Sequence, residues 1–116
     1  MKKILVIDDD KDILEVARIS LEFYGFDVKT LSTGVDVVDV VQQYHPDLIL
    51  LDIVLPEKSG MEVCKELRNL NSKIPLILFS ALSEKGKDLS ACKANGFIKK
   101  PFDIPQFVDT IKSYFK

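Results

Sequence analysis

The chain of 116 residues contains only two cysteines and one histidine. Cys64 and Cys92 fall inside predicted helices and far apart, so they suggest neither a disulfide scaffold nor a cysteine-based zinc site. The histidine, His45, precedes Pro46 in a predicted turn. The clustered sulfur and imidazole ligands that zinc prefers are therefore missing.

Long apolar runs and a strong excess of one charge are also missing. The run that follows Met1-Lys2-Lys3 has four apolar residues, which is too short for a signal peptide. No stretch approaches the roughly 20 apolar residues of a membrane span. The formal net charge of −2 does not suggest a basic surface for nucleic acid. We expect a cytoplasmic protein that binds neither nucleic acid nor membrane directly.

The composition is that of a globular protein, with 47% hydrophobic and 29% charged residues. A length of 116 residues corresponds to one domain of roughly 100–200 residues, which can bury a real core. We therefore expect residues 1–116 to form one domain. Whether this domain stands alone or was cut from a longer chain stays open.

Short apolar runs alternate with segments of helical periodicity along the chain. Fully buried strands are predicted at 4–7, 47–51 and 74–79, a more polar edge strand around 26–30, and a brief strand at 96–99. Helices are predicted at 10–24, 34–44, 61–69, 84–95 and 103–115. Residues 34–44 are rich in valine, which favours a strand, but eleven residues are long for a strand and Asp36 and Asp39 lie three apart.

Five such strand–helix units predict an α/β fold, a parallel sheet with helices on both faces. In this class the functional site lies beyond the carboxyl ends of the strands. Polar side chains stand at those ends: Asp8, Asp9, Asp52, Ser80 and Lys100. Each alone is most often a turn former, a helix cap or a solvated surface residue. Because they share one edge of the sheet, we expect them to meet in one pocket.

Three carboxylates in one pocket repel each other, so a proton or a cation must relieve the repulsion. Mg²⁺, for which Mn²⁺ can substitute, fits a set of oxygen ligands. The hydroxyl of Ser80 and the ammonium of Lys100 suit a phosphate bound beside the metal. Since a carboxylate can attack a phosphoryl group, the pattern predicts phosphoryl transfer onto an aspartate.

The joint pattern resembles the receiver domain of two-component response regulators over the whole chain. The matching segments are Ile4-Leu5-Val6-Ile7-Asp8-Asp9-Asp10, Asp47-Leu48-Ile49-Leu50-Leu51-Asp52-Ile53-Val54-Leu55-Pro56 with Gly60, Phe79-Ser80-Ala81 and Lys100-Pro101-Phe102. The resemblance implies a flavodoxin-like fold with five strands in the order 2-1-3-4-5.

The resemblance also implies a role for each site residue. Asp52 corresponds to the phosphoacceptor, while Asp9, Asp52 and the main-chain carbonyl of Val54 correspond to metal ligands, with Asp8 acting mostly through water. Ser80 and Lys100 would bind the phosphoryl group. Phe97 falls at the position of the family's aromatic switch residue. The alternative interpretation of Phe97 is a core aromatic residue without a switching role.

Receivers are signalling domains rather than enzymes of separate substrates, since they catalyse only their own phosphorylation and dephosphorylation. The implied donor is a sensor histidine kinase or a histidine phosphotransfer protein, and the phosphorylated form acts on a downstream protein that the sequence does not identify. The candidate partner surface consists of Ile13, Leu14, Phe102, Ile104 and Pro105. The alternative role of these residues is packing in the core.

Three departures from the family pattern stand out. Ser80 and Lys100 are twenty positions apart, about two fewer than in typical receivers, so we expect a short or irregular fourth helix. Val54 and Leu82 are apolar where some relatives carry polar side chains that steer water, which predicts slow dephosphorylation. Asn95-Gly96 replaces an acidic pair, with no functional consequence that we can derive.

Three other functions compete with this interpretation. A haloacid-dehalogenase-like phosphatase would use Asp8 as nucleophile and Asp10 as general acid, but only Asp103 and Asp109 follow Lys100 as acidic residues. A flavin-binding flavodoxin would need a loop rich in hydroxyls and glycine after the first strand. A pseudo-receiver interaction module would usually have lost one of the acids or the lysine.

Overall fold

The computed structural model describes residues 1–70, 72–80 and 92–115. Five parallel strands form one sheet in the order β2-β1-β3-β4-β5. The elements, in chain order, are β1 (Lys3–Ile7), α1 (Lys11–Phe23), β2 (Asp27–Leu31), α2 (Val37–Tyr44), β3 (Leu48–Asp52), α3 (Gly60–Asn69), β4 (Leu76–Ser80), β5 (Gly96–Lys99) and α5 (Ile104–Ser113). The predicted fold class and strand order are confirmed.

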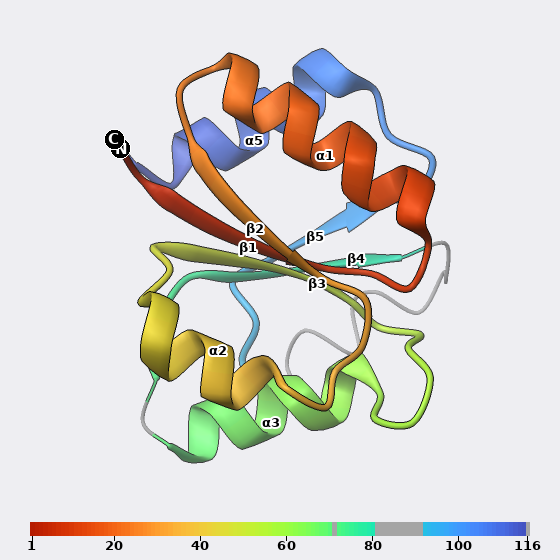
Figure 1. The fold of residues 1–116 in the computed structure, drawn as a ribbon, viewed down its shortest axis with the longest axis vertical. Coiled ribbons are helices and arrows are strands. Elements are labelled where there is room, and N and C mark those ends of the chain that lie inside the picture. The colour runs from red at the N-terminus through yellow and green to blue at the C-terminus, as the bar shows by residue number, and fades with distance from the viewer. Residues whose placement is uncertain (71, 81–91, 116) are drawn as a thin grey trace.

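The sheet separates two layers of helices. Figure 1 shows α1 and α5 on one face of the sheet and α2 and α3 on the other. Successive side chains of a strand point to opposite faces, so each central strand supplies both layers. In β1, Leu5 and Ile7 pack toward α2 and α3, whereas Ile4 and Val6 pack toward α1 and α5. Among the described residues, the two hydrophobic cores therefore lie on opposite faces of the sheet.

The continuous apolar runs are the buried central strands. Every residue of β3 and β4 is buried, whereas β2 at the edge has alternating exposed and half-buried positions. Because all strands are parallel, their carboxyl ends lie along one edge of the sheet. This common edge is where the sequence places its polar residues.

Local signals define several helix ends. Asp10 caps α1, its side chain accepting hydrogen bonds from the backbone N–H groups of Asp12 and Ile13. Gly25, with φ +93°, takes the left-handed conformation that follows this helix. Ser59 and Glu62 form a capping box at the start of α3, each side chain accepting from the other's backbone N–H.

Two predicted helices differ from the structure by three residues at one end, whereas the ends of the other predicted elements differ by two residues or fewer. Helix α2 begins at Val37 rather than at residue 34, because residues 34–36 form the turn that leads into it. Of the helix predicted at 84–95, residues 84–91 lie outside the described residues. Lys93 has φ 61°, which ends the helical conformation before Asn95.

The cysteines are not far apart, contrary to the sequence-based expectation. Cys64 of α3 and Cys92, just before β5, are paired as a disulfide with their Cα atoms 5.7 Å apart. Both are buried in the core beneath the α2 and α3 face of the sheet. The sheet order places the segment that enters β5 beside α3, so residues 28 positions apart meet in space.

Within the described part of the chain, no helix has the length and apolar character needed to cross a bilayer.

Candidate functional site

The strand-end residues gather at one cavity of about 400 Å³. Asp8 follows β1, Asp52 and Ser80 are the last residues of β3 and β4, and Lys100 follows β5. The cavity is lined by Asp8, Asp9, Asp10, Asp52, Val54, Ser80 and Lys100. The structure therefore brings together all five polar residues that the sequence places at strand ends.

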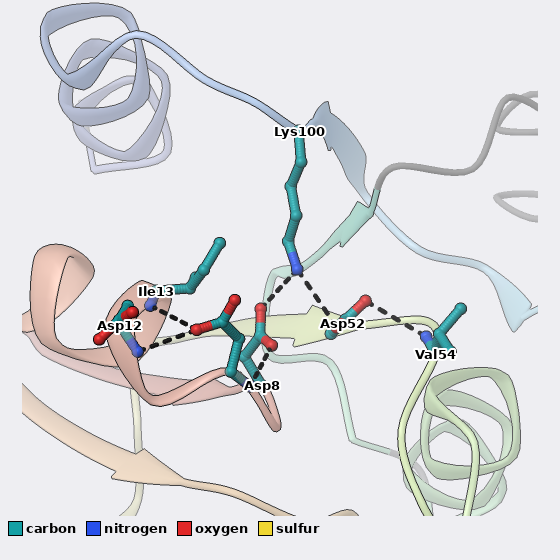
Figure 2. A network of polar contacts seen from close by, with 7 residues as sticks. Asp8, Asp12, Ile13, Asp52, Val54 and Lys100 are labelled. Carbon is teal, nitrogen blue, oxygen red and sulfur yellow. Dashed lines mark hydrogen bonds and ion pairs between the residues drawn. The ribbon is translucent and has the colours of Figure 1, made fainter.

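Lys100 reaches between two carboxylates. Its Nζ donates to Asp8 Oδ2 at 2.6 Å and to Asp52 Oδ2 at 3.2 Å, and Figure 2 shows this side chain reaching down between them. Burial lowers the pKa of Lys100, but its hydrogen bond to Asp8 and the charges of Asp52 and Asp8 outweigh burial and raise it. Lys100 therefore stays protonated and neutralises part of the acidic cluster.

One lysine does not balance the negative charge at this edge. Asp8, Asp9 and Asp52 each offer an oxygen atom, and these atoms lie within 4.8 Å of one another. Asp8 and Asp52 are almost completely buried, whereas Asp9 is exposed. Burial and the charge of Asp8 raise the pKa of Asp52 to about 6, although Lys100 and the Val54 N–H act in the opposite direction.

This donor set fits a hard divalent cation. A bound positive charge relieves the repulsion between crowded carboxylates and the raised pKa of Asp52, and oxygen ligands of this kind suit Mg²⁺. The cluster contains no imidazole or thiolate that would favour zinc. The residues predicted as metal ligands therefore lie where such an ion can bind.

The loop after β1 orients Asp8 through its own backbone. The N–H of Asp10 donates to Asp8 Oδ1 at 2.9 Å, and Lys100 takes the other oxygen of this carboxylate. The carboxylate of Asp10 accepts from Asp12 N at 2.9 Å and from Ile13 N at 3.4 Å (Figure 2). Asp10 thus serves as a helix cap, a use that does not favour the general-acid role of the phosphatase alternative.

The loop after β3 holds Asp52 against the start of α3. Val54 N donates to Asp52 Oδ1 at 3.2 Å, and Gly60 N donates to the carbonyl of Ile53 at 2.8 Å. A Cβ atom on Gly60 would lie 2.0 Å from the carbonyl oxygen of Asp52, so only glycine permits this close approach. The packing of α3 therefore fixes the backbone that carries Asp52.

Phe97 lies on β5 and is not among the residues that line the acidic cavity. It pairs in register with Leu78 of β4 and packs, half-buried, against the core beneath α2 and α3. Its switching role stays a prediction. Slow dephosphorylation is predicted from Val54 and Leu82, and Leu82 lies outside the described residues.

A second, mainly apolar groove of about 250 Å³ contains part of the predicted partner surface. It contains the predicted residues Ile13, Phe102 and Ile104 together with three others, Asp12, Val16 and Pro101. Leu14 does not line the groove, because it is buried in the core with α5; Pro105 is exposed but lies outside the lining.

Sequence reasoning missed two residues that contribute to these surfaces. The Lys100 ammonium lies 4.7 Å from the centre of the Phe79 ring, and this cation–π contact helps to hold the ammonium in place. Phe79 belongs to a continuous apolar strand, so only the tertiary structure reveals this contact. Val16 is 41% exposed, and its helical spacing of three from Ile13 is the signal that could have found it.

Comparisons with known proteins agree with this geometry. The family model for the response regulator receiver domain matches residues 4–112. The polar-differentiation response regulator DivK of Brucella ovis is 35% identical over 119 residues, covering 97% of this chain and 95% of DivK. The response regulator MprA of a Mycobacterium species is 32% identical, covering 98% of this chain and 50% of MprA.

Solved structures give the same result. Vibrio cholerae chemotaxis protein CheY4 superposes with a TM-score of 0.92 at 25% identity, covering 98% of both chains. The receiver domain of the Francisella response regulator 1452 superposes with a TM-score of 0.91 at 27% identity, covering 99% of this chain and 97% of that one. With the family match, the relatives and the acidic edge of its sheet in agreement, the chain belongs to the response regulator receiver domain family.

Proposed function

We propose that this receiver accepts a phosphoryl group on Asp52 from a phosphohistidine donor and that Mg²⁺ assists the transfer. The observation that carries the proposal is the buried carboxylate of Asp52, which is paired with Lys100 and offers an oxygen within 4.8 Å of oxygens of Asp8 and Asp9. A nucleophile, a fixed cation and a cation-binding set thus share one cavity.

In the proposed transfer, an Oδ atom of Asp52 attacks phosphorus while the bond between phosphorus and the donor's imidazole nitrogen breaks. The electron pair of that bond returns to the imidazole. Catalysis of such a transfer consists mainly of positioning and charge neutralisation. Lys100 holds its ammonium beside Asp52 for the phosphoryl oxygens, and Ser80 offers its hydroxyl at the end of the neighbouring strand.

The metal ligands in this proposal are the carboxylates of Asp9 and Asp52 and the main-chain carbonyl of Val54, with Asp8 acting mostly through water. When bound, Mg²⁺ supplies positive charge that offsets the charge of the transferred group. Asp8 also keeps Lys100 in place through its 2.6 Å ion pair. Mn²⁺ has the same preference for oxygen ligands and can substitute.

The phosphorylated chain acts as a switch in this proposal. A new dianion beside Ser80 favours a conformation in which Ser80 moves inward and Phe97 fills the space that this movement vacates. A shift from 1:99 to 99:1 between two such conformations requires about 5.5 kcal/mol of differential stabilisation. The downstream protein would bind the surface that this change alters.

The apolar groove beside the site is the proposed docking surface for the phosphohistidine donor. Ile13, Phe102 and Ile104 line it, and Pro101 joins it directly to Lys100 in the chain. A donor seated there would present its imidazole toward the acidic cavity. We expect this phosphoryl transfer to take place in the cytoplasm, where such phosphorylation cascades operate.

Phosphorylation with a small-molecule donor tests this function. The purified chain is incubated with Mg²⁺ and acetyl phosphate, and its intact mass is compared with that of Asp52→Asn and Asp8→Asn variants. We expect wild type to gain one labile phosphoryl group and Asp52→Asn to gain none. Beryllofluoride is a suitable stable analogue, since a structural relative, the Klebsiella pneumoniae RstA receiver domain, is described as BeF3-activated.

The same experiment distinguishes the alternatives. A haloacid-dehalogenase-like phosphatase would depend on Asp8 as its nucleophile and would modify the Asp52→Asn variant normally. A pseudo-receiver would gain no phosphoryl group in any variant. Either result contradicts the proposed function.

A further inference from the structure

We propose that Cys64 and Cys92 are a reversible redox modification site, at which a cation-lined cavity admits an anionic low-molecular-weight disulfide. This proposal does not depend on the phosphoryl chemistry at the acidic cavity, which shares no lining residue with the cavity at Cys92. Its starting point is the pairing of the two cysteines across α3 and the segment before β5, with a Cα–Cα separation of 5.7 Å. This separation is ordinary for a disulfide and requires no backbone movement.

The two segments are held together without the sulfur atoms. Arg68 of α3 donates from Nε to the carbonyl of Lys93 at 3.2 Å and from Nη2 to Asn95 Oδ1 at 2.9 Å. Its Nη1 also donates to the carbonyls of Ser72 and Ile74. Arg68 therefore keeps Cys92 beside α3 when the cysteines are reduced, which favours rapid closure of the disulfide.

The reduced state is also accommodated. The carbonyl oxygen of Cys92 lies 3.2 Å from Sγ of Cys64, so the buried thiol has a hydrogen-bond acceptor. Both cysteines pack among apolar side chains, where a reduced cysteine behaves as a small hydrophobic residue. The reduced pair therefore fits the same packing as the disulfide, so we expect the pair to change state without unfolding the core.

A cavity of about 110 Å³ borders one of the two cysteines, Cys92, which is itself 2% exposed. It is lined by Cys92 together with Lys65, Arg68, Asn69 and Lys93. Three of these side chains are cationic, which favours the thiolate form of a cysteine and attracts an anionic reagent. Cys64 does not line this cavity, so we assign the first attack to Cys92.

The exchange takes place in two balanced steps. The Cys92 thiolate attacks one sulfur of the external disulfide, so that a mixed disulfide forms and the first small thiolate leaves and takes up the proton lost by Cys92. The Cys64 thiolate then attacks the Cys92 sulfur, closes the internal disulfide and releases the second small thiolate, which takes up the remaining proton. Two cysteine thiols are oxidised and one external disulfide is reduced to two thiols.

Thiol counting on the folded protein tests the site. The reduced chain is treated with glutathione disulfide at neutral pH, quenched with an alkylating agent and analysed by intact mass. We expect a monomer with no alkylated cysteine, restored to two alkylated cysteines by dithiothreitol. Recovery of two free thiols after treatment, or only intermolecular and mixed disulfides, overturns the proposal. Neither Mg²⁺ nor acetyl phosphate is present, so failure here is separate from failure of the phosphoryl-transfer proposal.

Thermal unfolding measures the effect of the cross-link on the same chain. A closed loop spanning 28 positions predicts a melting temperature roughly 10 °C higher for the oxidised than for the reduced wild type. Cys64→Ala and Cys92→Ala are the matched controls, because each lacks the cross-link and should show no shift on oxidation. An equal melting temperature for oxidised and reduced wild type contradicts a cross-link within the fold.

The charge of the cavity is tested by the rate of oxidation. We expect the Lys65→Gln/Lys93→Gln variant to react several-fold more slowly than wild type with anionic glutathione disulfide at low ionic strength, and not more slowly with the cationic disulfide cystamine. A Lys29→Gln/Lys112→Gln variant, which changes lysines outside the cavity lining, is the control for net charge. Equal slowing in both variants, or slowing with both reagents, overturns the role of the cavity.

Discussion

At the residue scale, Asp52 is held in an environment that disfavours its charge. Its pKa is raised to about 6 from an ordinary value of 3.8, so the folded protein binds the proton more tightly than the unfolded chain does. The stability that this proton contributes is fully present below pH 3.8 and is lost as the pH rises through 6. The ionised carboxylate of Asp52 therefore lowers the stability of the fold at neutral pH.

This environment predicts that Asp52→Asn stabilises the metal-free protein. At pH 7.5 with a chelator present, we expect the variant to be about 2 kcal/mol more stable than wild type, because the buried charge and its repulsion by Asp8 are removed. Urea unfolding at several pH values measures the difference, which should shrink as the pH falls toward 4. A variant that is less stable than wild type across this range would contradict the argument.

Lys100 has the opposite effect on the same cluster. We expect Lys100→Met to destabilise the chain by about 3 kcal/mol at pH 7.5 without metal, because two buried carboxylates lose their shared partner. The loss should be smaller at pH 5, since the pKa of Asp52 rises further and the carboxyl takes up a proton. Urea unfolding at both pH values checks this prediction, and an equal loss at both would show that packing against Phe79, not charge, dominates.

At the scale of the elements, the junction between β3 and α3 depends on one small residue. We expect Gly60→Ala to cost about 2–3 kcal/mol and to weaken Mg²⁺ binding, because a Cβ cannot fit against the carbonyl of Asp52. Ser59→Ala at the adjacent helix cap is the control, with an expected loss of about 1 kcal/mol and unchanged Mg²⁺ affinity. Calorimetric titration with Mg²⁺ measures both, and unchanged affinity in Gly60→Ala would show that Asp52 does not depend on this contact.

The elements also show where local sequence signals suffice. Asp10, Gly25 and the box of Ser59 and Glu62 act within a few residues, so the ends that they define agree with their sequence signals. The sequence predicts the start of α2 three residues too early because its valines are compatible with helix, strand and turn, and packing against the sheet selects among them.

At the scale of the whole molecule, the parallel sheet and its acidic edge could be predicted from the residues and the strand order from the resemblance to receiver domains, whereas contacts across the layers could not be predicted. Buried parallel strands appear as continuous apolar runs, and their ends identify the site directly. The pairing of Cys64 with Cys92 and the position of Phe79 beneath Lys100 depend on how α3, β4 and β5 pack together. No periodicity within one segment carries that information.

The two cores on opposite faces of the sheet should respond independently to mutation. Ile49 belongs to the core beneath α2 and α3, and Ile111 to the core beneath α1 and α5. We expect Ile49→Val and Ile111→Val each to cost about 1 kcal/mol, and the double variant to equal their sum within about 0.5 kcal/mol. Denaturant unfolding of the four proteins checks this, and a coupling above about 1 kcal/mol would contradict separate cores.

The residue that carries the phosphoryl group can be identified directly. After treatment with Mg²⁺ and acetyl phosphate, reduction with borohydride converts an aspartyl phosphate to homoserine, whose position peptide mass spectrometry then reads. We predict homoserine at position 52 alone, and none in a sample from which Mg²⁺ has been removed by a chelator. Homoserine at position 8 or 9, or its absence at every position, would contradict phosphoryl transfer to the end of β3.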